Sequence, residues 1–195
     1  MNVAEFPKDT AYSMSLRSKL LVLALLVEGA AFILALFLAR QWGIALFPLT
    51  KHLLHDVLIG TAAAAIPFAL FCFTLSEKAE GIPLLGSIRK TVRKDIKAVF
   101  ASTTVVDICL ISLWAGLAEE LLFRGVIQAR WGLLAASILF GVLHFVTPVY
   151  ALLAMVIGFY IGLVYHFFQS LLIPIQLHAI YDFGALIYLR YVVRE

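Results

Sequence analysis

The segment TTVVDICLISLWAGLAEELLFRGVIQ, residues 103–128, places two adjacent glutamates and an arginine inside a run that is otherwise mostly apolar. The run is long enough to cross the hydrocarbon core of a bilayer, which takes about 20 residues of helix. A charged side chain at the centre of a membrane helix costs roughly 2.5–3.5 kcal/mol on insertion scales. Glu119, Glu120 and Arg124 therefore indicate a buried site and not only a membrane anchor.

The composition of the whole chain agrees with a membrane protein. The 195 residues are 63% hydrophobic and 14% charged, whereas a soluble domain carries about 25% charged residues. We expect an all-α, polytopic transmembrane helical bundle that forms a single domain, residues 1–195, and has no nucleic-acid partner. The expected membrane helices, about six, are residues 20–39, 57–75, 103–128, 131–146, 150–168 and 171–191.

A basic segment separates the second and third apolar runs. Residues 88–99 interleave basic residues with apolar ones at spacings of three and four, which is typical of an amphipathic helix on the membrane surface. There it could dock on anionic lipid headgroups; a solvated basic loop is the alternative. If six helices cross the membrane, most of the fifteen Lys and Arg residues fall on the side of the N-terminus. The positive-inside rule then predicts that both termini are cytoplasmic.

The two glutamates of the first motif are expected to differ in role. Glu120 and Arg124 are four residues apart, in the acid-before-base order that favours an ion pair along a helix. Glu119 lies about 100° around the same helix, so we expect no intrahelical partner for it. An unpaired, desolvated carboxylate suits general acid–base chemistry. The alternative is that both glutamates bind Arg124 and only lock helices together.

Two further polar pairs lie in later apolar runs. Phe140 and His144 share one helix face, and so do His178 and Asp182. The Asp182 carboxylate can accept the N–H of His178 and fix its tautomer. Each pair alone is compatible with simple packing. Together with the first motif they predict one site, because lipid excludes buried ionisable groups and drives them toward a common interior.

These motifs resemble those of the CAAX protease and bacteriocin-processing family, which includes the type II CAAX prenyl endopeptidases. That family carries EExxxR, then FxxxH, then HxxxN or HxxxD, in separate transmembrane helices. The matching residues here are Glu119-Glu120-Leu-Leu-Phe-Arg124, Phe140-Gly-Val-Leu-His144 and His178-Ala-Ile-Tyr-Asp182. The resemblance covers about residues 103–190, which we take as the catalytic core.

The resemblance implies peptide hydrolysis within the membrane by a glutamate, a histidine and an activated water molecule. It assigns water activation to Glu119 and His144, and oxyanion stabilisation to His178 with Asp182. The supporting residues would be Glu120, Arg124 and Phe140.

Position 182 departs from the prenyl endopeptidases, which carry asparagine there as an amide donor to the oxyanion. An ionised Asp182 would repel a developing oxyanion. We therefore expect Asp182 either to be protonated or to orient His178 as the donor, and the spacing of four residues favours the second hypothesis. Zinc is the competing chemistry, since His144, His178 and a carboxylate would supply three ligands. No HExxH pair is present, so we expect no metal and no other cofactor.

The motifs and the composition together predict an integral membrane endopeptidase of a prokaryotic cell membrane. Its substrate would be a membrane-embedded or lipid-anchored protein or peptide, such as a CAAX-type prenylated tail, a C-terminal sorting segment or a leader peptide. One alternative is a non-catalytic membrane protein that keeps the same scaffold, such as a bacteriocin immunity factor. Another is a proton-coupled carrier, in which buried glutamate and histidine side chains relay protons.

Overall fold

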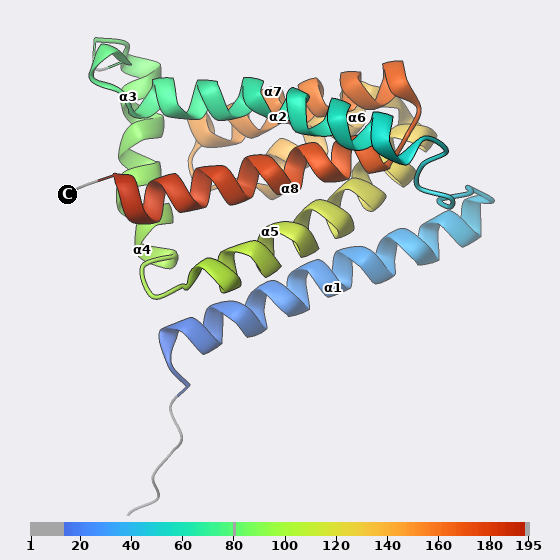
Figure 1. Ribbon diagram of the computed structural model, residues 1–195, viewed down its shortest axis with the longest axis horizontal. Coiled ribbons are helices and arrows are strands. Elements are labelled where there is room, and N and C mark those ends of the chain that lie inside the picture. The colour runs from blue at the N-terminus through green and yellow to red at the C-terminus, as the bar shows by residue number, and fades with distance from the viewer. Residues whose placement is uncertain (1–13, 80, 194–195) are drawn as a thin grey trace, which may run out of the picture.

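The computed structural model describes residues 14–79 and 81–193, and every regular element in these ranges is helical. The long helices are α1 (Leu16–Trp42), α2 (Leu53–Leu75), α5 (Val105–Glu120), α6 (Ala129–Leu143), α7 (Pro148–Phe168) and α8 (Leu172–Ile187). The shorter elements are η1 (Glu77–Ala79), α3 (Pro83–Thr91), η2 (Val92–Ile96), α4 (Lys97–Val99), η3 (Leu121–Gln128) and η4 (Tyr188–Val192). The helical bundle expected from the composition is confirmed (Figure 1).

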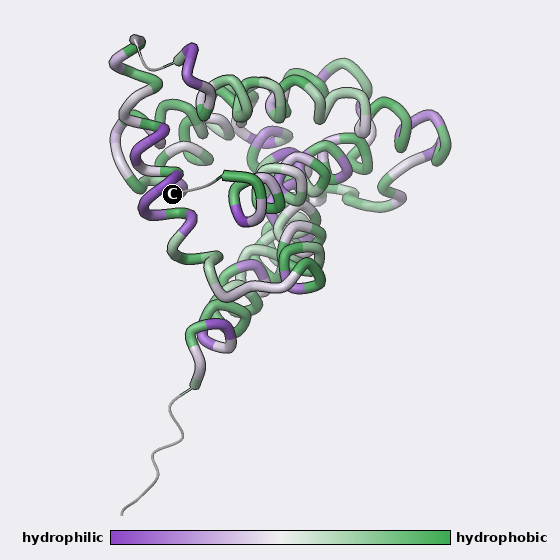
Figure 2. The backbone as a smooth tube through the Cα atoms, turned by 60° about the vertical axis from the view of Figure 1, so that its left-hand side comes forward, coloured by the Kyte–Doolittle hydropathy of each residue, from purple (hydrophilic) through white to green (hydrophobic). Residues whose placement is uncertain are grey.

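Five helical stretches in the described ranges are long and apolar enough to cross a membrane. They are Leu16–Trp42, Leu53–Leu75, Val105–Leu143, Pro148–Phe168 and Leu172–Val192. Hydrophobic residues dominate the long helices, while many hydrophilic ones lie near the ends of the bundle and along the segment of residues 83–99 (Figure 2). The third stretch, of 39 residues, contains two of the six predicted membrane helices.

The stretch Val105–Leu143 reverses direction at Gly132, where φ is +84°. In an unbroken helix, 25 residues would separate Glu119 from His144 by about 37 Å, yet their side chains lie 3.6 Å apart. Glycine adopts this backbone conformation without the steric strain that other residues meet. The two arms are therefore antiparallel. The second arm ends at Leu143, earlier than the predicted residue 146.

Helix α8 lies between α2 and α5 (Figure 1), and glycines on both neighbours allow the close approach. A Cβ atom on Gly60 of α2 would lie 2.9 Å from the carbonyl oxygen of Ile173. A Cβ atom on Gly116 of α5 would lie 3.0 Å from the backbone nitrogen of Ala179. Small residues at such contacts let membrane helices pack backbone against backbone. The side chain of His178, in the middle of α8, is consequently buried.

Helix α1 lies along α5 (Figure 1). A bidentate ion pair fixes the position of α1 along the axis of α5. Arg17 donates from Nε to Asp107 Oδ2 at 2.6 Å and from Nη2 to Asp107 Oδ1 at 2.8 Å. Asp107 also closes the N-terminus of α5, because it forms a capping box with Thr104. Further along, the rings of Phe32 and Trp114 lie 5.3 Å apart. These contacts set which residues of α1 face the interior.

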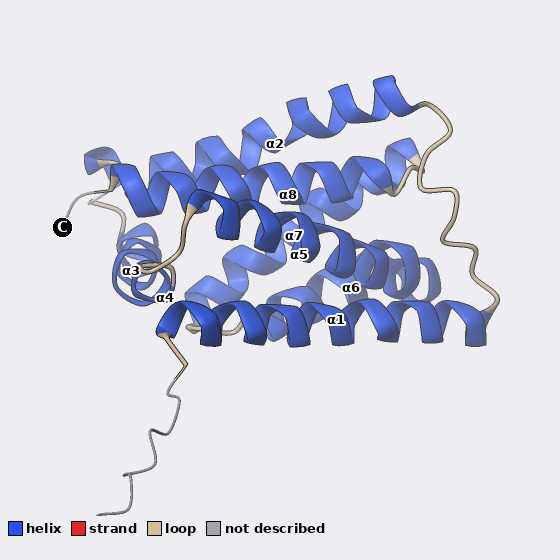
Figure 3. Ribbon diagram, turned by 60° about the horizontal axis from the view of Figure 1, so that its bottom comes forward, coloured by secondary structure: helices blue, strands red, loops and turns tan. Residues whose placement is uncertain are grey.

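The basic segment of residues 83–99 is helical and crosses one end of the bundle (Figure 1). Its apolar residues Ile88 and Val92 are buried against Leu75 and Leu189. The predicted amphipathic helix is thus present, and its apolar face packs on the ends of α2 and η4. The first described residues of α1 and the last residues of η4 lie at this same end, whereas the α1–α2 loop lies at the other (Figure 3).

Candidate active site

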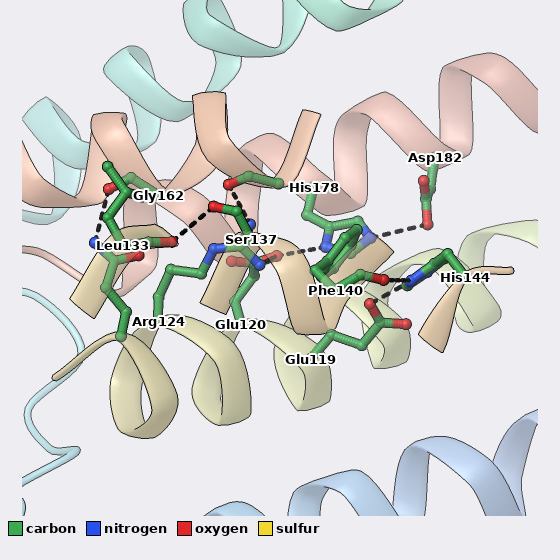
Figure 4. Close-up of polar contacts among 12 residues, drawn as sticks. Glu119, Glu120, Arg124, Leu133, Ser137, Phe140, His144, Gly162, His178 and Asp182 are labelled. Atoms are coloured by element: carbon green, nitrogen blue, oxygen red, sulfur yellow. Dashed lines mark hydrogen bonds and ion pairs between the residues drawn. The ribbon is translucent and has the colours of Figure 1, made fainter. Parts of the chain in front are cut away.

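The three predicted motifs come together in the interior of the bundle (Figure 4). The first lies across the junction of α5 and the π-helical segment η3, the second on α6, and the third on α8. π-Helical turns inside α-helices are found often at functional sites. The reversal at Gly132 brings the second motif back beside the first.

Glu119 faces His144 across this reversal. Glu119 Oε2 lies 3.6 Å from His144 Nε2, and Oε2 is buried without a hydrogen-bond partner among the described residues. On its other side, the His144 ring places Nδ1 2.9 Å from the carbonyl oxygen of Phe140. A proton on Nδ1 donates to that carbonyl and leaves Nε2 free to accept another. A water molecule between Glu119 and His144 would therefore meet two proton acceptors.

The neighbouring Glu120 is fully enclosed and holds three helices together. Its Oε1 accepts hydrogen bonds from Arg124 Nη1 at 2.9 Å and from His178 Nδ1 at 2.6 Å. Arg124 also donates from Nη2 to the carbonyl oxygen of Gly158 on α7, at 2.8 Å. The expected pair of Glu120 and Arg124 is present. Glu119 faces His144 instead, so the two glutamates do not share the arginine.

Gln128 makes a contact that sequence reasoning missed. Its Nε2 donates to the carbonyl oxygen of Gly162 at 2.9 Å, one turn along from the contact between Arg124 and Gly158. A Cβ on Gly162 would lie 2.7 Å from Gln128 Oε1, and one on Gly158 would lie 3.2 Å from the Phe140 ring. The sequence did contain a signal for this contact, because Arg124 and Gln128 are four residues apart and so are Gly158 and Gly162. Gly162 thus lets Gln128 of η3 reach the backbone of α7, and Gly158 makes room on α7 for the ring of Phe140.

His178 lies between two carboxylates. Its Nδ1 lies 2.6 Å from Glu120 Oε1, and its Nε2 lies 3.3 Å from Asp182 Oδ2. The side chain of His178 is 6% exposed and that of Asp182 is 29% exposed, so Asp182 is on the more open side of the ring. This geometry suits the hypothesis that Asp182 orients His178.

Phe140 packs against the ionisable groups. Its ring stacks on that of His144, with centroids 4.2 Å apart and an interplanar angle of 19°. Arg124 Cζ lies 4.9 Å from the same ring, within the range of a cation–π contact. The His178 ring meets Phe140 edge-on, at 6.0 Å. Phe140 thus holds both histidine rings in place and keeps bulk water away from the arginine.

A cavity of about 280 Å³ opens beside these groups. Glu119, His144, His178 and Asp182 line it in the interior. From there it extends between α2, α7 and α8 to the underside of the basic segment, where Ile88 and Val92 form part of its wall. Glu28, Tyr150 and Tyr181 also line the cavity. For Glu28, the sequence favoured packing or a hydrogen bond over a contact with the site, and it gave no sign of the two tyrosines. The remainder of the lining is mostly apolar.

The histidine nitrogens that zinc would need have close neighbours in the described structure, with the exception of His144 Nε2. Both ring nitrogens of His178 contact carboxylate oxygens, and Nδ1 of His144 contacts a carbonyl oxygen. Within the described ranges, no group of three or more His, Cys, Asp or Glu side chains is placed to hold a metal ion.

Residues 101–184 match the family model described as type II CAAX prenyl endopeptidase Rce1-like. The resemblance indicated by the three motifs is thereby confirmed. The Rce1-like segment contains α5 to α7 and most of α8, with all three motifs, while α1 and α2 lie outside it. The chain is also 38% identical over 89 residues to YpbD of Bacillus subtilis (strain 168), an uncharacterized protein.

The matched region covers 44% of this chain and 47% of YpbD, so it spans about half the length of that relative. No solved structure matches the chain.

Proposed function

We propose that this protein is an intramembrane endopeptidase in which Glu119 and His144 activate a water molecule. The observation that carries the proposal is the placement of Glu119 Oε2, which is buried, has no hydrogen-bond partner among the described residues and lies 3.6 Å from His144 Nε2. Both groups line the cavity that leads into the bundle. The Rce1-like match over residues 101–184 supports the reaction class.

The proposed reaction begins with a water molecule held between Glu119 and His144. Glu119 takes a proton from the water, and the oxygen bonds to the carbonyl carbon of the scissile peptide. The resulting tetrahedral species carries the negative charge on its oxygen. When the C–N bond breaks, the proton held by Glu119 passes to the leaving nitrogen. His144 Nε2 can carry that proton between them. The products are a carboxylic acid and an amine, and transfer of the acid's proton to the amine leaves a carboxylate and an ammonium group.

His178 is the proposed donor to the oxyanion. The distance from its Nε2 to Asp182 is 3.3 Å, longer than the roughly 2.7–2.9 Å typical of a charge-assisted hydrogen bond. Because Nδ1 donates to Glu120, a proton on Nε2 requires the imidazolium form of His178, which the carboxylates of Glu120 and Asp182 on either side favour. That second proton would be available to an oxyanion in the cavity. Glu120 fixes the opposite side of the ring at 2.6 Å, so the donor is oriented before the substrate arrives.

The cavity suggests a substrate with an apolar segment. Between the ionisable groups and the basic segment of residues 83–99, its walls are mostly apolar side chains. A membrane-associated peptide entering from this end would place its apolar part against α2 and α8 and its scissile bond beside Glu119. A prenylated tail, a sorting segment and a leader peptide all meet this requirement. We place the protein in a prokaryotic cell membrane, with this end of the bundle and both termini on the cytoplasmic side.

The proposal is tested by peptide cleavage with the purified protein in detergent. Prenylated and unmodified membrane-tail peptides would be offered together, and the products identified by mass spectrometry. Wild type is compared with Glu119→Ala and with Glu77→Gln, which changes an exposed carboxylate outside the cavity. We expect wild type and the Glu77 variant to cleave at least one peptide and Glu119→Ala to cleave none. Equal cleavage by all three proteins would contradict the assignment.

Failure of wild type to cleave any peptide would favour the two rival functions. A proton-coupled carrier would then show pH-driven flux in vesicles. An immunity factor would protect cells and would keep that function in Glu119→Gln.

A further inference from the structure

Glu28 is a carboxyl group in the middle of α1, outside the Rce1-like segment, and it lines the same cavity as Glu119. The rest of the central part of α1 is apolar, and much of it is exposed on the outer surface of the bundle. A carboxyl group at this depth in a membrane helix is therefore unusual, and we expect it to be paired with a hydrogen-bond donor or a cation.

Glu28 has no such partner within the described structure. Its Oε2 is buried without a hydrogen-bond partner, and the side chain makes no other hydrogen bond or ion pair with the described residues. Two buried aspartates outside the site behave differently. Asp107 is bound by Arg17 and Thr104, and Asp56 is bound by Thr50, His55 and Ser170. These two aspartates are thus bound by neighbouring side chains, whereas Glu28, which lines the cavity, is not.

The position of Glu28 is set by α1 itself. The bidentate pair of Arg17 with Asp107 lies on one side of Glu28 along the helix, and the contact of Phe32 with Trp114 lies on the other. Helix α1 is therefore held against α5 both before and after Glu28. The carboxyl group is presented to the cavity by a fixed helix and not by a loop.

The site as a whole has more acceptors than donors. Its wall holds the carboxyl groups of Glu28, Glu119 and Asp182, and Glu120 lies directly behind His178. Against these four carboxyl groups stand one arginine, two histidines and the hydroxyl groups of Tyr150 and Tyr181, and Arg124 is already bound to Glu120 and Gly158. A peptide brings the missing donors, since each residue other than proline carries a backbone N–H. Burying such an N–H without an acceptor would be costly.

We propose that Glu28 is a substrate-binding residue that accepts a hydrogen bond from a backbone N–H of the peptide held in the cavity. The inference rests on the proposed function, because it takes the occupant of the cavity to be a peptide. A carboxyl group can accept this bond whether it is ionised or protonated. Glutamine keeps a carbonyl oxygen at the same reach, whereas leucine keeps the size and removes the acceptor.

The test combines kinetics with binding. Steady-state cleavage of one peptide is measured for wild type, Glu28→Gln, Glu28→Leu and the control Glu77→Gln. Loss of one hydrogen bond to substrate corresponds to a change of about tenfold. We expect Glu28→Leu to raise KM about tenfold with little change in kcat, and Glu28→Gln and the control to stay within about threefold of wild type. The thermal unfolding temperature should not fall in Glu28→Leu, since that variant removes an unpartnered polar group.

Binding is measured separately with a fluorescent form of the same peptide and with the Glu119→Ala protein, which is not expected to turn over. When Glu28→Leu is combined with Glu119→Ala, the Kd for the peptide should rise about tenfold, which again corresponds to the loss of one hydrogen bond. Unchanged KM and Kd in Glu28→Leu would overturn the inference while leaving the proposed function intact, and so would equal losses in the leucine and glutamine variants. If the peptide bound in a Glu28-dependent way but wild type did not cleave it, the role of Glu28 in peptide binding would be supported. The proposed endopeptidase function would be contradicted.

Discussion

Glu120 Oε1 lies 2.6 Å from His178 Nδ1, which ties α5 to α8. The next residue back in the chain, Glu119, has different surroundings. Glu120 is enclosed by Arg124 and His178, and Glu119 points toward the cavity and His144. The division follows from helix geometry, because neighbouring side chains lie about 100° apart around the axis. One carboxylate can hold the bundle together while the next remains available for chemistry.

Removing the Glu120 carboxylate should destabilise the fold. Glu120→Ala leaves Arg124 buried beside Gly158 without its counter-ion. Breaking a buried pair from one side costs about 3–5 kcal/mol. The free energy of unfolding, measured by denaturant titration in detergent micelles, should fall by that order, whereas Glu77→Gln should leave it unchanged. A Glu120→Ala protein as stable as wild type would show that the pair does not hold the helices.

Substitutions of Asp182 test whether its side chain contributes to the site. If Asp182 orients His178 through the 3.3 Å contact, asparagine should retain much of the activity because its amide oxygen accepts the same N–H. Alanine should lower kcat about 10–100-fold, as is usual when the partner of an active-site histidine is removed. The measurement is kcat for the two variants on one peptide. If alanine were as active as wild type, Asp182 would have no role in the site.

The reversal at Gly132 should not tolerate a side chain. Alanine at a φ of +84° carries a strain of about 1–3 kcal/mol. Relief of that strain would move the second arm and separate Glu119 from His144, so we expect Gly132→Ala to lose both stability and cleavage. Gly29→Ala is the matched control, since Gly29 lies within α1 and a Cβ there would meet no atom within 4 Å. Equal effects of the two substitutions would mean that the reversal does not depend on glycine.

Much of this fold follows from the apolar runs, and the meeting of the three motifs follows from the exclusion of ionisable groups by lipid. The pair of Glu120 with Arg124 was predictable because both residues lie on one helix. The depth at which Glu119 meets His144 was not predictable. The expected break between residues 128 and 131 indicates two helices but does not fix how they align, and the reversal lies at Gly132. The contact of Gln128 with Gly162 and the exposure of Glu28 to the cavity depend on how helices pack. Periodicity along a single helix does not reveal such packing.

The most direct test of the central claim is the cleavage rate of Glu119→Gln and His144→Ala, measured with and without a zinc chelator. Glutamine keeps the size of Glu119 and removes its capacity to take a proton from water. Thermal unfolding in detergent confirms first that both variants fold as wild type does. We predict that each substitution lowers kcat at least roughly 10²–10⁴-fold, the contribution usual for a positioned base, and that the chelator leaves wild type unaffected. A Glu119→Gln protein that cleaves at the wild-type rate, or a wild type that the chelator inactivates, would contradict glutamate-activated proteolysis.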